Sequence, residues 1–94
     1  MSNVVKVSEA ASLALHTVVL LAAYPKRIFS TKDISSALHA SEAHLSKVLQ
    51  RLGKAGLVNS IRGPKGGFVL SRSSDEITLL EVYEAIEGPL ASSS

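Results

Sequence analysis

An abrupt change of hydrophobic period in the second half of this sequence constrains its fold. Four apolar residues follow the i, i+3, i+4, i+7 spacing of one helix face: Leu45, Val48, Leu49 and Leu52. The next segments, 57–62 and 67–72, are instead rich in β-forming residues and are joined by Gly-Pro-Lys-Gly. We therefore expect a helix over about 42–55, ended by a left-handed Gly56, and then a β-hairpin with a basic tip.

Capping signals predict the helices that precede this point. Ser8 starts a first, strongly apolar helix that ends before Tyr24-Pro25, because the residue before a proline disfavours helical geometry. Ser30 and Asp33 have the spacing of a capping box and start a short helix that runs to about residue 38. After a break at 39–41, Ser41 is the expected N-cap of the helix over 42–55.

A last helix is predicted after the hairpin. Thr78 and Glu81 form its capping box, and Gly88-Pro89 ends it. Its expected core face consists of four residues: Leu79, Val82, Tyr83 and Ile86. The element order is then helix, helix, helix, hairpin, helix, which is mainly α with a small β-hairpin and defines a winged helix-turn-helix. The length of 94 residues suits one domain, expected over 1–90 with a disordered tail over 91–94.

Composition excludes several classes of protein. The chain has no cysteine, which excludes a disulfide framework, a zinc–thiolate site and a cysteine nucleophile within it. The apolar run 13–23 is shorter than the ~20 residues that a membrane span needs, so we interpret it as a buried helix that also contacts a second chain. Since nothing else in the sequence suggests secretion, we expect a cytoplasmic protein. We find no convergent acid, base and nucleophile, and therefore expect that it is not an enzyme.

The small net charge of +2 hides a strong polarity along the chain. Residues 26–72 hold nine Lys and Arg against two acids, a sum of +7, whereas residues 73–94 hold five acids and no base, a sum of −5. This asymmetry indicates a polyanionic partner for the middle segment.

The helix over 42–55 is the predicted recognition helix, which enters the major groove with the face opposite its core stripe. That face is expected to hold His44, Lys47, Arg51 and Lys54. The predicted contacts to base edges lie near its N-terminus: Ser41, Ala43, His44 and Lys47. Arg51 lies further along and is expected to contact phosphate. The structural alternative, a merely solvated basic face, is less favoured beside a basic hairpin.

The tip of the hairpin, 62–67, is the predicted wing at the minor groove. Its expected DNA contacts are Arg62, Gly63, Pro64, Lys65 and Gly66, because glycines admit a phosphate ridge and an arginine suits a narrow minor groove. A nucleotide-binding glycine loop is excluded, since no Gly-Lys-Ser/Thr follows and the loop joins two strands. Thr31 and Lys32 open the short helix and are expected to hold another phosphate.

The same residues are also consistent with a second function. The apolar first helix and the acidic last helix also suit a winged-helix module that binds other proteins. Glu81, Glu84 and Glu87 belong to that last helix and mark either a face turned away from DNA or a surface for a partner helix.

Several stretches resemble the Rrf2 family of bacterial winged-helix transcription regulators: HLSKVLQRL at 44–52, AGLV at 55–58, RGPKGGF at 62–68, ITLLE at 77–81 and EAIEGP at 84–89. The resemblance implies a homodimer on a roughly palindromic operator, with DNA contacts at Ser41, His44, Lys47 and the tip 62–66.

Many members of this family hold an iron–sulfur cluster through cysteines beyond the wing, ahead of a long dimerisation helix. This chain has no cysteine, and Ser12 stands where some members have an acidic ligand, although His16 matches a ligating histidine. We therefore expect only the DNA-binding part of the family pattern and no iron–sulfur cofactor.

Overall fold

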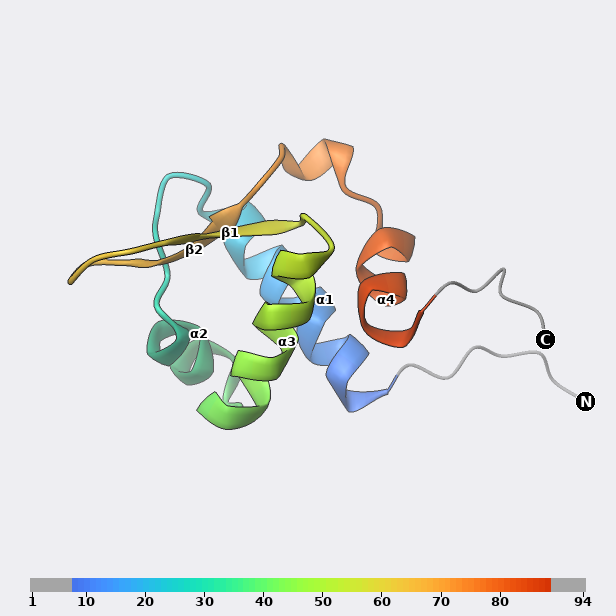
Figure 1. Cartoon of the computed structure of the whole chain (residues 1–94), viewed down its shortest axis with the longest axis horizontal. Coiled ribbons are helices and arrows are strands. Elements are labelled where there is room, and N and C mark those ends of the chain that lie inside the picture. Colours follow the sequence, from blue (N-terminus) through green and yellow to red (C-terminus); the bar gives the residue numbers. More distant parts are fainter. Residues whose placement is uncertain (1–7, 89–94) are drawn as a thin grey trace, which may run out of the picture.

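The computed structural model describes residues 8–88 and confirms the predicted element order (Figure 1). Its elements are α1 (Glu9–Ala23), α2 (Thr31–Leu38), α3 (Glu42–Lys54), β1 (Val58–Ile61), β2 (Gly67–Leu70), the 3₁₀ turn η1 (Ser74–Glu76) and α4 (Leu79–Glu87). The η1 turn was not expected from the sequence. Pro89, the expected tail 91–94 and the domain boundary at 90 lie outside the described residues.

The helix ends are set by the side chains that the sequence singles out. The Ser30 hydroxyl accepts the Asp33 N–H at 3.0 Å, while the Asp33 carboxylate accepts the Ser30 N–H at 3.1 Å. Thr78 and Glu81 form the same reciprocal pair at the start of α4. Since each bond satisfies a backbone donor that the helix leaves unpaired, these caps determine where the helices begin.

The end of α3 is a Schellman motif around Gly56. The Gly56 N–H donates to the Gly53 carbonyl at 3.0 Å, and the Leu57 N–H donates to the Leu52 carbonyl at 2.9 Å. Gly56 has a φ of 77°, a conformation that a side chain would disfavour. This turn confirms the predicted end of the helix and sends the chain into β1.

One core holds the helices together. The stripe Leu45, Val48, Leu49 and Leu52 is buried as predicted, against α1, α2 and α4. The expected core role of Leu79 is wrong: it is 67% exposed, whereas Val82 and Ile86 are buried. Leu79 is the first residue of α4, and at this end of the helix the buried face begins only with Val82.

The apolar α1 is likewise not buried on every side. Ala11, Ala14, Val18 and Leu21 face the core, but Val19 is 58% exposed. A helix packed on one small domain has neighbours on only part of its circumference, so its outer face stays in solvent. No helix within residues 8–88 is long and apolar enough to cross a membrane.

The two strands form an antiparallel hairpin, the wing, in which Val58 pairs with Leu70 and Ile61 with Gly67. A backbone bridge ties this hairpin to the loop before α2. The Phe68 N–H donates to the Phe29 carbonyl at 2.8 Å, and the Phe29 N–H donates back at 3.2 Å. The wing is therefore anchored at its base, while its tip extends away from the helices (Figure 1).

Candidate nucleic-acid interface

The outward face of α3 is defined by its buried stripe. At about 100° per residue, the direction opposite the core is occupied by Ala43, Lys47, Gln50 and Lys54. All four residues are exposed. Ser41 accepts the His44 N–H at 3.0 Å and stands exposed at the start of the same helix. This face offers a methyl group, two cations and one amide to solvent.

His44 and Arg51 lie to one side of that direction, toward α1 and α4. They line a 250 Å³ cavity together with Ala10, Lys47, Val48, Ile86 and Glu87. The Nη1 of Arg51 donates to the Ile86 carbonyl oxygen at 2.9 Å. The face predicted from the sequence is therefore rotated toward α4 relative to the face that the structure leaves most open.

A groove on the other side of α3 faces the wing. It has a volume of 400 Å³ and is lined by Thr31, Ser46, Lys47, Leu49, Gln50, Ser60 and Phe68. Ser46 and Gln50, which carry no charge, are not among the residues predicted from the sequence to contact DNA. Measuring angles from the centre of the core stripe would have placed Gln50 on the open face.

The wing tip presents its basic residues at the end of the hairpin. Arg62, Pro64 and Lys65 are exposed, and the Gly66 N–H closes the turn on the Gly63 carbonyl at 2.9 Å. A Cβ on Gly66 would lie 2.1 Å from the Ile61 carbonyl oxygen, and Gly63 has a φ of 116°. Both glycines are thus needed by the turn itself, whatever the tip contacts.

At the start of α2 a carboxylate already occupies the positive end of the helix dipole. The hydrogen bond from the Ser30 backbone is the main cause that lowers the pKa of Asp33. Thr31 is half-buried in the groove beside Gln50, and Lys32 is exposed. This helix end therefore places Thr31 in the groove and carries both an exposed cation and an exposed carboxylate in its first turn.

Two other arginines of the basic segment are engaged within the protein. Arg72 pairs with Glu81 at 3.0 Å, and the Arg27 guanidinium lies 4.4 Å from the centre of the Phe29 ring. The pKa of Glu81 is lowered first by the backbone hydrogen bond from Thr78 and then by Arg72. The acidic α4 lies on the opposite side of the molecule from the wing tip (Figure 1).

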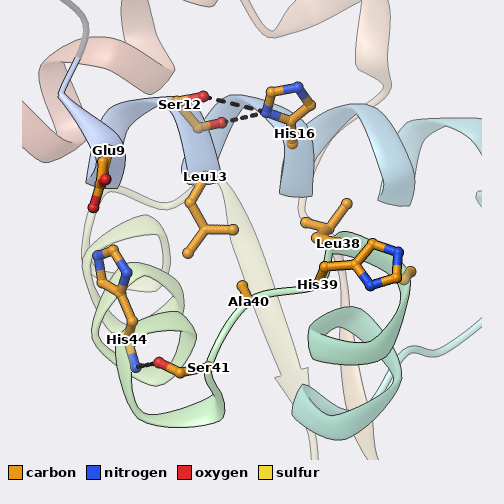
Figure 2. Close-up of a pocket in the computed structure, with 10 residues that line it drawn as sticks. Glu9, Ser12, Leu13, His16, Leu38, His39, Ala40, Ser41 and His44 are labelled. Atoms are coloured by element: carbon orange, nitrogen blue, oxygen red, sulfur yellow. Dashed lines mark hydrogen bonds between the residues drawn. The ribbon is translucent and has the colours of Figure 1, made fainter.

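An open 560 Å³ cleft between α1 and the turn joining α2 to α3 contains all three histidines of the chain (Figure 2). Glu9 and His44 point toward one another across it. His16 does not take part in this pair: its Nδ1 donates to the Ser12 carbonyl oxygen, within α1, at 2.8 Å.

The residues of this chain do not match the ligands of an iron–sulfur cluster. Within residues 8–88 no three His, Cys, Asp or Glu residues are grouped to hold a metal ion. The 94 residues also contain no cysteine thiolate, the usual ligand of such a cluster.

The fold and this exposed basic helix beside a hairpin define a winged helix-turn-helix protein. Comparison with known proteins agrees. The profile of the Rrf2 family, described as iron-dependent transcriptional regulators, matches residues 7–94. The chain belongs to the Rrf2 family.

Individual relatives support the same assignment. The transcriptional regulator CymR of Bacillus subtilis is 40% identical over 62 residues, 66% of this chain and 45% of the relative. NsrR of Shouchella clausii is 36% identical over 78 residues, 82% of this chain and 52% of the relative. The chain thus spans about half the length of these curated relatives.

Solved structures share the fold. The structure of CymR, the global cysteine regulator of B. subtilis, superposes with a TM-score of 0.88 at 33% identity, over 97% of this chain and 71% of that one. T. potens IscR superposes with a TM-score of 0.83 at 31% identity, over 96% of this chain and 66% of that one.

Proposed function

We propose that this protein is a sequence-specific double-stranded-DNA-binding transcription regulator. In this proposal α3 enters the major groove and the wing tip lies at the minor groove. The observation that carries the proposal is the open face of α3, where Lys47 and Lys54 stand opposite the buried stripe and beside a wing with a basic tip. Membership of a family of transcriptional regulators supports it.

The contacts divide by chemistry. Ser41, Ala43, His44 and Lys47 near the start of α3 are the proposed base-edge contacts. Phosphate and backbone contacts are assigned to Thr31, Lys32, Arg51 and the tip residues Arg62, Gly63, Pro64, Lys65 and Gly66. Arg51 has five N–H donors, so its bond to Ile86 leaves others for a phosphate.

We further propose that the protein acts as a homodimer in the cytoplasm, without catalytic activity and without a cofactor held by these residues alone. Val19, Leu79 and Leu80 are large apolar side chains that are each at least half exposed, and their exposure supports contact with a second copy. Sedimentation equilibrium measures the mass in solution, and a monomer at all concentrations would contradict the dimer.

Salt dependence separates DNA binding from the alternative of a protein-interaction module. Binding of the full chain to duplexes selected from a random library should weaken steeply as salt rises, because cations released from the DNA drive association. Enrichment of one sequence, with a steep salt slope, is the expected result. Failure to enrich any sequence, at low salt as at high, would contradict the proposed function.

A further inference from the structure

Gln50 lies on the open face of α3, at the side of that face that borders the wing. Leu49, the residue before it, and Leu52, two residues after it, are buried at 1% and 0% exposure on the opposite face, so the backbone that carries Gln50 is packed on the core. Gln50 itself is exposed and forms one wall of the groove between α3 and the wing. A rigid backbone with an outward side chain is the arrangement that base recognition requires.

The amide of Gln50 differs chemically from its neighbours on this face. Lys47 and Lys54 only donate hydrogen bonds, and Ala43 does neither. A glutamine amide both donates and accepts, which matches the N6 and N7 atoms of adenine in the major groove. No hydrogen bond of this amide occurs within residues 8–88, so nothing in that part of the chain competes for it.

The spacing along α3 then relates Gln50 to Lys47. Three residues advance a helix by about 4.5 Å, which is more than one and less than two of the about 3.4 Å steps between successive base pairs. Both side chains line the same groove. A lysine donates to guanine O6 and N7, so the two residues address neighbouring base pairs with different preferences.

We propose that Gln50 determines specificity by pairing with an adenine next to the base pair contacted by Lys47. This inference rests on the proposed DNA-binding function and deepens it. The alternative is that Gln50 makes no base contact and that Lys47 and the residues before it alone determine sequence specificity.

The test is selection from a random-sequence duplex library with the full chain, repeated for Gln50→Ala, Gln50→Lys and Lys47→Ala. Lys47→Ala identifies its own base pair as the position where preference is lost. At the neighbouring pair Gln50→Ala should lose the adenine preference, with about ten-fold weaker binding to the selected duplex. Gln50→Lys should change that preference to guanine.

Asn59→Ala is the matched control. It removes an exposed amide from β1, next to Ser60, but on the other face of the hairpin because successive strand residues alternate. Its selected sequence should be that of the wild type.

Different failures have different meanings. A wild-type chain that selects no sequence overturns the proposed function and this inference with it. A wild-type chain that selects a sequence which Gln50→Ala selects equally well overturns this inference alone. A loss of affinity for Gln50→Ala that is uniform over all sequences also overturns it, since that is the behaviour of a phosphate contact.

Discussion

The guanidinium of Arg51, on α3, donates from Nη1 to the carbonyl oxygen of Ile86 in the last turn of α4, at 2.9 Å. This bond joins two elements 35 residues apart and places a positive charge at the negative end of a helix dipole. It holds the proposed recognition helix against the helix that carries the acidic segment.

We expect Arg51→Met to lower the free energy of unfolding by about 1 kcal/mol, because a part-buried, charge-assisted hydrogen bond is lost. Lys54→Met removes a cation from the same helix and should change stability by less than about 0.5 kcal/mol. Urea denaturation of both variants measures the difference. Equal unfolding midpoints would show that the bond to Ile86 does not stabilise the fold.

Lys47→Ala and Arg62→Ala should weaken DNA binding in different ways while leaving the circular dichroism spectrum unchanged. Lys47→Ala should lose about 1–3 kcal/mol of binding free energy and should lose sequence preference at one base pair only, as expected for a base-edge contact. Arg62→Ala should weaken binding more evenly and reduce the salt slope by about 1.

Lys26→Ala removes a charge from the exposed loop before α2 and serves as the control for both variants. If Lys26→Ala weakened binding as much as Lys47→Ala or Arg62→Ala does, the loss of net charge, rather than the position of the lost charge, would explain the effect.

Gly67→Ala should destabilise the wing. A Cβ on Gly67 would lie 2.2 Å from the Phe29 carbonyl oxygen, which is itself bonded to the Phe68 N–H. We expect a loss of about 1–3 kcal/mol as the bridge is forced apart, measured by urea denaturation and by amide exchange at Phe68.

Gly53→Ala is the matched substitution within α3. The added Cβ would meet nothing closer than 4.0 Å, and the position is helical. It should therefore stabilise the protein by about 0.5–1 kcal/mol, because alanine loses less conformational freedom in a helix. A destabilised Gly53→Ala would contradict the packing described around the end of α3.

The capping carboxylates predict how stability varies with acid. The folded state lowers the pKa of Asp33 and of Glu81, mainly through backbone hydrogen bonds from Ser30 and Thr78. Their contribution is therefore complete above the unfolded pKa values of about 3.9 and 4.3 and is lost as pH falls through the lower folded values.

The double variant Asp33→Asn/Glu81→Gln should then show a shallower fall in unfolding midpoint between about pH 6 and about pH 3. Glu9→Gln is the control, since position N3 of α1 is Ala11 and no capping box forms there. An identical acid slope in the double variant and the wild type would contradict this origin of the pH dependence.

Local interactions explain why so much of the fold could be predicted. Ser30 and Asp33, or Thr78 and Glu81, meet across three residues, and Gly56 ends α3 through bonds to the same helix. Such contacts depend on neighbours in the sequence, so helix limits and the hairpin follow from residue type and spacing.

The orientation of α3 follows less directly from the sequence, because positive charge alone does not show which flank of a helix is covered. Arg51 and His44 lie on the side of α3 that faces α1 and α4, and Gln50 lies on the open face. Which flank of a helix is covered depends on where its neighbours pack, and those neighbours are distant in the chain.

From its residues alone, the chain specifies a winged helix-turn-helix with a basic middle segment and an acidic end, because helix caps, hydrophobic period and turn residues act over short distances. The exposure of Leu79, the anchoring of the wing through Phe29 and Phe68, and the bond from Arg51 to Ile86 come from contacts between distant segments. Those contacts exist only once the core has assembled, and they determine which side chains of α3 stand free.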